Sequence, residues 1–151
     1  MRTLFEAVKG QGRLDVESFV PVPERTTVYE LRNSLPVFNL SQKRFFRPVE
    51  GEVVGYNHTS DLISRVAGPG YFFVMNGESG ELVFDYTRSV GLRPPGWPKI
   101  RPNTGIGPGA VYGEMLDYVW AVSRHTAIGE AYRHGKSRGS WFLVTRAVSE
   151  S

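Results

Sequence analysis

The sequence predicts a mainly β fold: a small antiparallel β-barrel with a short N-terminal helix and one late helix. About six to eight short segments carry the β-branched and aromatic residues that are typical of strands. The connections between most of them are short, which favours antiparallel pairing. Because antiparallel sheets can avoid exposed edges by closing, we expect a barrel rather than an open sandwich.

A central hairpin over residues 71–88 is the clearest single element. Two predicted strands, residues 71–76 and 81–88, flank a turn of sequence Gly-Glu-Ser-Gly at residues 77–80. Side chains alternate between faces along a strand, and neither face of residues 71–76 is polar. This pattern predicts that both faces of the first strand are covered.

The elements expected before the hairpin follow from periodicity and from the turn residues between them. Residues 38–46 fit either a strand or an extended loop. In chain order we expect a helix over residues 2–9 and then strands over 26–33, 52–57 and 62–67, with this open segment between the first two strands.

After the hairpin, residues 91–109 contain five prolines and five glycines, which predicts a long loop. Trp97, near its middle, is large enough to anchor this loop or to cover the mouth of a cavity. Apolar residues at helical spacing over 111–122 predict the late helix, and residues 126–134 and 140–147 are predicted closing strands.

Length and composition indicate one globular domain over residues 1–151. The chain has no cysteine, which excludes disulfides and thiol catalysis. Its net charge of +3 comes from basic residues dispersed along the chain, so a nucleic acid is not an expected partner. The longest uncharged stretches, residues 66–77 and 102–113, are too short to span a bilayer, so no membrane partner is expected either. No signal-peptide pattern begins the sequence, which predicts a cytoplasmic protein. The sequence leaves homo-oligomerisation open.

The order of elements resembles the architecture of calycin or lipocalin-like barrels and fatty-acid-binding barrels, although no family motif accompanies it. A barrel of about eight strands either fills with side chains or holds one small ligand. With nine phenylalanines, seven tyrosines and three tryptophans, the chain can line such a cavity. We therefore expect a small, largely apolar metabolite as ligand or substrate, held in a hydrophobic cavity.

Polar residues on the predicted strands are the candidate catalytic groups. Tyr86 and Arg88 share one face and would orient a substrate oxygen, while Glu130 and Tyr132 would handle a proton. Whether these faces point into or out of the barrel stays open. The candidate substrate-binding residues are aromatic: Tyr71, Phe73, Trp97, Tyr118 and Trp141.

These residues predict a cofactor-independent isomerase, cyclase or lyase that uses acid–base chemistry. Three irregularly spaced histidines and no cysteine give no metal signature, so neither a metal nor a cofactor is expected. The alternative is a non-catalytic module that binds a protein or nucleic acid through Lys43, Arg44, Phe45, Phe46 and Arg47.

Overall fold

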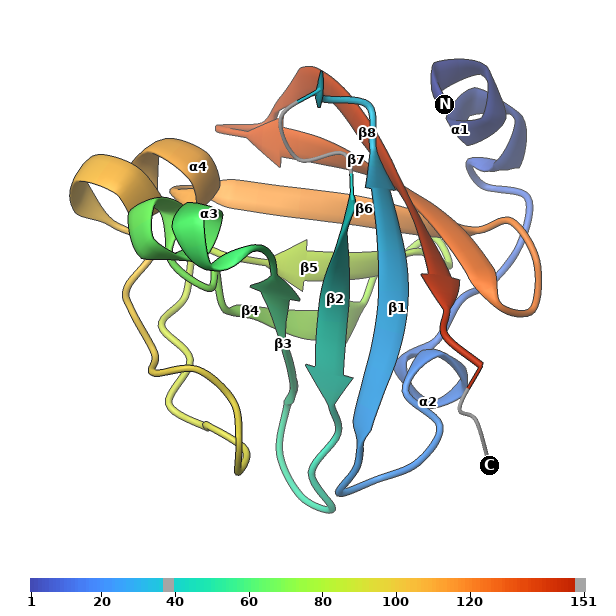
Figure 1. Ribbon diagram of the computed structural model, residues 1–151. Helices are drawn as coiled ribbons and strands as arrows, with labels where there is room; N and C mark the ends of the chain where they lie inside the picture. Colours follow the sequence, from blue (N-terminus) through green and yellow to red (C-terminus); the bar gives the residue numbers. More distant parts are fainter. Residues whose placement is uncertain (37–39, 149–151) are drawn as a thin grey trace.

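A computed structural model describes residues 1–36 and 40–148 of the chain. Eight antiparallel strands form a closed barrel in which each strand pairs with its neighbours in sequence, and β1 pairs with β8 to close it (Figure 1). The strands are β1 (Thr26–Asn33), β2 (Leu40–Phe46), β3 (Val53–His58), β4 (Phe72–Asn76), β5 (Leu82–Asp85), β6 (Met115–Ala121), β7 (Thr126–Arg133) and β8 (Lys136–Arg146). The predicted antiparallel barrel is confirmed.

The central hairpin is β4 and β5, which pair with Phe73 opposite Asp85. Both faces of β4 are covered, as the sequence indicated. Phe72 and Val74 point into the barrel core, whereas Phe73 packs on the outside against the cluster around Trp97. This double coverage explains why neither face of the strand is polar.

Aromatic rings fill the middle of the barrel. Phe45, Phe72 and Phe84 lie with ring centroids 5.1–5.8 Å apart. Two strand glycines leave room for such rings: a Cβ on Gly55 would meet the Phe72 ring, and one on Gly129 would meet the ring of Phe142. Small residues on β7 therefore face inward to accommodate the core.

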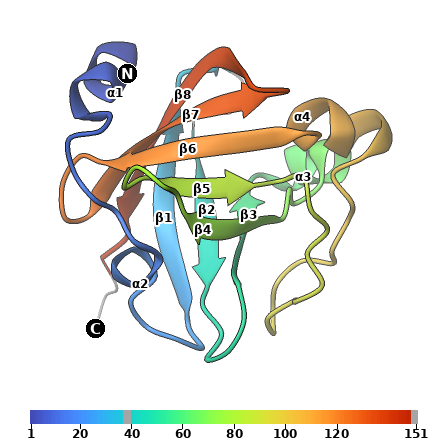
Figure 2. The same cartoon turned by 180° about the vertical axis from the view of Figure 1, so that it is seen from behind.

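One end of the barrel is closed by the short helix α2 (Val16–Phe19) (Figures 1 and 2). Asp15 caps its N-terminus by accepting a hydrogen bond from the Ser18 amide at 2.8 Å. Phe19 stacks on Tyr29 with ring centroids 4.3 Å apart, and both are fully buried. This end has no room for a ligand in the core.

The opposite end carries α3 (Asp61–Ala67) and α4 (Ala110–Tyr112), which lie side by side in both views (Figures 1 and 2). The expected strand over residues 62–67 is wrong, because Ser60 starts a helix there and Ile63 and Ala67 form its packed side. The predicted late helix over residues 111–122 is wrong in its extent. It stops at Tyr112, and Glu114 takes a positive φ of 55° before β6 begins.

The predicted N-terminal helix is confirmed as α1 (Arg2–Val8), which lies against the outer face of β6 and β7 (Figure 2). Its Phe5 is buried with Trp120 and Ile128. Among the described residues, no helix is both long and apolar enough to cross a membrane.

Candidate functional site

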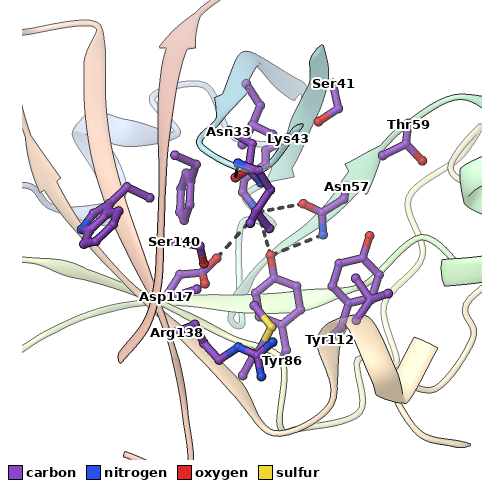
Figure 3. A pocket seen from close by; sticks show the side chains of 17 residues that line it. Asn33, Ser41, Lys43, Asn57, Thr59, Tyr86, Tyr112, Asp117, Arg138 and Ser140 are labelled. Atoms are coloured by element: carbon purple, nitrogen blue, oxygen red, sulfur yellow. Dashed lines mark hydrogen bonds and ion pairs between the residues drawn. The ribbon is translucent and has the colours of Figure 1, made fainter. Parts of the chain in front are cut away.

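A cavity of about 120 Å³ remains inside the barrel at the end that carries α4 (Figure 3). It begins where the aromatic core ends, next to Phe142. Its walls are apolar and its floor is polar. The lining residues are Leu31, Asn33, Leu35, Ser41, Lys43, Asn57, Thr59, Tyr86, Val111, Tyr112, Met115, Asp117, Ala131, Arg138, Ser140, Trp141 and Phe142.

Lys43 is the central residue of the polar floor. It points inward from β2, and only 4% of its surface is exposed. Its Nζ donates hydrogen bonds of 2.7 Å to Oδ1 of Asn57 and 2.7 Å to Oη of Tyr86 (Figure 3). The same nitrogen lies 4.9 Å from the centroid of the Phe72 ring and 5.0 Å from that of Phe142. Ring faces and hydrogen-bond acceptors thus surround the ammonium group.

Asp117 faces Lys43 from β6 across the barrel and is 2% exposed. Its Oδ2 lies 3.8 Å from Nζ of Lys43, which makes a buried ion pair. Its Oδ1 is also buried and has no hydrogen-bond partner within residues 1–36 and 40–148. A buried carboxylate oxygen without a donor is costly, so this atom is ready to accept a proton or a hydrogen bond from a ligand.

Asn57 and Tyr86 complete the floor. The Asn57 amide nitrogen donates to the Gly70 carbonyl at 3.1 Å and to Oη of Tyr86 at 3.3 Å, which fixes the orientation of the amide. Oη of Tyr86 therefore accepts two hydrogen bonds, one from Asn57 and one from Lys43. Its own O–H faces the Asp117 carboxyl and can be donated to that group or to a ligand beside it. Tyr112 of α4 stacks on Tyr86 with centroids 5.6 Å apart.

Burial changes the ionisation of all three central groups. It lowers the pKa of the Lys43 ammonium to about 8, and the charge of Asp117 opposes that shift. It raises the pKa of the Asp117 carboxyl to about 6, opposed by the charge of Lys43. The pKa of Tyr86 is raised well above its ordinary value, first by burial and then by the charge of Asp117. Tyr86 is therefore a neutral donor at physiological pH, and Asp117 and Lys43 titrate on either side of neutrality.

The mouth of the cavity is also polar. Figure 3 shows the hydroxyl-bearing residues Ser41, Thr59 and Ser140 around the central group. Arg138, from the first part of β8, adds a guanidinium to the lining. A ligand can thus bury an apolar part against the walls and place polar atoms at the floor and the mouth.

The arrangement suits proton transfer next to an oxygen. The Lys43 ammonium and the Tyr86 hydroxyl can stabilise negative charge on a substrate oxygen, and Asp117 can take or return a proton. No group of three or more histidine or acidic residues that could hold a metal ion occurs in the described part of the chain.

Of the four residues predicted to be catalytic, only Tyr86 lines this cavity. Arg88 lies outside the barrel wall, where it pairs with Glu52 and Asp85 and covers the Phe73 ring at 4.1 Å. Glu130 and Tyr132 also lie on the outer face, since the inward residues of β7 are Ala127, Gly129 and Ala131. The structure does not bring the four residues together.

Glu130 and Tyr132 instead belong to a second polar cluster beneath α1. Ser137 donates to Oε1 of Glu130 at 2.5 Å, and Tyr132 donates to Oε2 at 3.2 Å. The Tyr132 ring meets Tyr118 edge-on at 5.1 Å. Because both carboxylate oxygens of Glu130 have donors, this cluster has the pattern of a structural network.

Of the five residues predicted to bind substrate, one borders the cavity. Trp141 borders the cavity, although its ring packs against the cluster of Phe5, Trp120 and Ile128. The other four do not line it: Tyr71, Phe73, Trp97 and Tyr118.

Trp97 does not cover the cavity mouth. Its ring lies 4.7 Å from Tyr56 and 6.0 Å from Tyr71 on the outer face of the barrel, and its Nε1 donates to Oγ1 of Thr26 at 3.0 Å. Trp97 therefore anchors the loop of residues 91–104 to the barrel wall, which is the other role that its size allowed.

Asn57, Asp117 and Tyr112 are site residues that sequence reasoning missed, and Lys43 was named only for the alternative binding module. A signal was present in β6, where Met115, Asp117 and Val119 share the inward face and a carboxylate interrupts an apolar row. Lys43 interrupts the inward face of β2 in the same way, next to Phe45. A single charged residue on an otherwise buried strand face is the pattern that would have identified both.

The alternative binding module loses its supporting feature. Phe45 and Phe46 are 0% and 7% exposed, so neither can stack a base or anchor a partner. Lys43 is buried as well, and Arg47 donates to the backbone carbonyls of Val20 and Pro21. Residues 43–46 belong to β2 of the barrel wall.

Comparisons of the chain with protein families, with curated proteins and with solved structures find no match. The chemistry of the cavity is therefore what indicates a function.

Proposed function

We propose that the protein is a cofactor-independent enzyme that moves a proton in a small carbonyl compound bound inside the barrel, as an isomerase, cyclase or lyase does. The observation that carries this proposal is the unpartnered, buried Oδ1 of Asp117 beside the Lys43 ammonium. A buried charge pair is expensive, and replacing it with apolar residues is often neutral or stabilising. A chemical role accounts for its position on the floor of a cavity.

Each floor residue has a distinct role in this proposal. The substrate oxygen accepts hydrogen bonds from the Lys43 ammonium and the Tyr86 hydroxyl. Asp117 removes the proton from the neighbouring carbon, and the ammonium stabilises the enolate oxygen that forms. Asn57 positions Tyr86 and Lys43 through its fixed amide. These roles replace those first assigned to Glu130, Tyr132 and Arg88.

The size of the cavity limits the substrate. A volume of about 120 Å³ is well below the roughly 300–1,000 Å³ of sites for drug-sized ligands. A compound of a few carbon atoms fits, or the reactive end of a longer one whose remainder extends through the mouth. Leu31, Val111 and Met115 supply apolar contacts for its carbon skeleton.

A solvent-exchange experiment tests the proposal without knowledge of the natural substrate. Small ketones and oxo acids are incubated with the protein in D₂O, and proton NMR follows the loss of the signals of hydrogens next to the carbonyl. We expect the protein to accelerate this exchange for at least one compound. Asp117→Asn should reduce the acceleration by about 100-fold or more, because it removes the base.

Glu130→Gln is the matched control, since it neutralises a buried carboxylate on the outer face of the wall. It should leave exchange within about twofold of the wild type. Asp117 would be ruled out as the base if Asp117→Asn and Glu130→Gln reduced the exchange rate equally. It would also be ruled out if exchange survived Asp117→Asn in a folded protein. Bound ligand without any exchange across the panel would show a binding protein instead.

A further inference from the structure

The charges that line the cavity do not cancel. Lys43 and Arg138 are its cationic residues, and Asp117 is its one acidic residue within the described part of the chain. With Asp117 ionised, the lining carries a net charge of +1. A cavity with low-dielectric walls and an excess positive charge favours an anion over a neutral molecule of the same shape.

Lys43 and Arg138 differ in the interactions that they make. Lys43 is already paired, because it contacts Asn57, Tyr86 and Asp117. Arg138 forms no salt bridge with any acidic residue among residues 1–36 and 40–148. Arg138 is exposed and lines the cavity, and in Figure 3 its side chain lies beside the ring of Tyr86. A guanidinium binds a carboxylate through two parallel hydrogen bonds.

The floor disfavours the carboxylate of a ligand, since Asp117 would repel it and Lys43 is already paired there. The mouth places it near Arg138 and the hydroxyl of Ser140, and leaves the floor for an uncharged oxygen. A molecule that satisfies both ends has a carboxylate at one end and a carbonyl at the other.

We propose that the substrate is a small monoanionic oxo acid, bound with its carboxylate at Arg138 and its carbonyl oxygen at Lys43 and Tyr86. This inference rests on the proposed proton transfer and names its substrate class. The bound anion would neutralise the net charge of the cavity. The acidic hydrogens of such a compound lie next to its carbonyl group, which is where Asp117 acts.

The test compares two pairs of probes that differ in charge but not in heavy-atom count. Pyruvate is compared with pyruvamide, and acetoacetate with acetoacetamide, by ligand-observed NMR titration at low ionic strength. We expect at least one acid to bind about tenfold more tightly than its amide. Arg138→Gln should abolish this preference and leave amide binding within about twofold. Arg124→Gln is the control, because Arg124 is an exposed arginine of the turn between β6 and β7.

Equal affinity of acid and amide, no binding of either acid, or a preference that survives Arg138→Gln would each overturn the assignment. The proposed function fails by a different result. If Asp117-dependent exchange of a neutral ketone persists without a charge preference, only the oxo acid is wrong. If the charge preference is present but no compound exchanges, the anion site stands and the catalytic proposal fails.

Discussion

Nζ of Lys43 lies 3.8 Å from Oδ2 of Asp117, and the two side chains are 5% and 3% exposed where the aromatic core of the barrel meets the cavity. The pair joins β2 to β6 across the barrel interior, between strands that are not neighbours. Because ion pairs at this depth must offset a large desolvation cost, the hydrogen bonds from Lys43 to Asn57 and Tyr86 are needed to hold the ammonium there.

This pairing predicts strong coupling between the two residues in stability. Lys43→Met leaves an uncompensated buried carboxylate, and Asp117→Leu leaves an uncompensated ammonium. Each single change should lower the free energy of unfolding by about 3–5 kcal/mol. The double variant should lose far less than the sum, since no charge is left buried. Urea unfolding of the four proteins measures the cycle, and additive losses would show that the two groups do not interact.

The proposed roles predict a bell-shaped pH dependence of the exchange rate. Asp117 acts as a base only when ionised, so activity should rise with pH through its pKa of about 6. Lys43 stabilises the oxygen only when protonated, so activity should fall as pH rises through its pKa of about 8. The two limbs belong to the coupled pair rather than to either residue alone.

The kcat/KM of the wild type and of Lys43→Met, measured from pH 5 to pH 10, checks this dependence. The variant should lose the alkaline limb, because the ammonium is gone, and should shift the acidic limb upward, because Asp117 loses its cationic neighbour. An alkaline limb that remains in the variant would assign it to another group.

Local sequence patterns predicted most of the barrel because its strands are short and are separated by turn residues. Residues 26–33 form β1 with the expected bounds, and the hairpin was read from its turn and its two apolar faces. The failures arose where one pattern fits two structures. Val111, Met115, Tyr118 and Val122 match helical spacing, yet Gly113 and the positive φ of Glu114 end the helix after one turn.

The candidate site could not be predicted because barrel closure assembles it. Three of its polar residues, Lys43, Asn57 and Asp117, lie on β2, β3 and β6, and Tyr86 directly follows β5. No two of the four are close in sequence. Which face of each strand points inward depends on how the strands pair, not on the strand alone. The outward position of Glu130 and Tyr132 follows from Gly129, whose lack of a side chain makes room for Phe142 inside the barrel.

That arrangement predicts a specific effect of a methyl group at residue 129. Gly129→Ala would place its Cβ under 3.0 Å from three atoms of the Phe142 ring, so the core must shift. The free energy of unfolding should fall by about 1–3 kcal/mol. Gly91→Ala is the control, since no atom lies within 4 Å of the added carbon there. Thermal or urea unfolding compares them, and equal stability of the two variants would contradict this account of the core.

Trp97 provides the last test, because a lid and an anchor respond differently to its removal. As an anchor it contributes packing against Phe46, Tyr56 and Tyr71 on the outer face, so Trp97→Ala should lower the free energy of unfolding by about 3–5 kcal/mol. The kcat/KM for exchange by the folded protein should stay within about twofold of the wild type, since the ring does not line the cavity. Thr26→Val removes only the acceptor of the indole N–H and should cost about 1–3 kcal/mol. A large fall in kcat/KM with unchanged stability would instead show that the loop of residues 91–104 closes over the site during turnover.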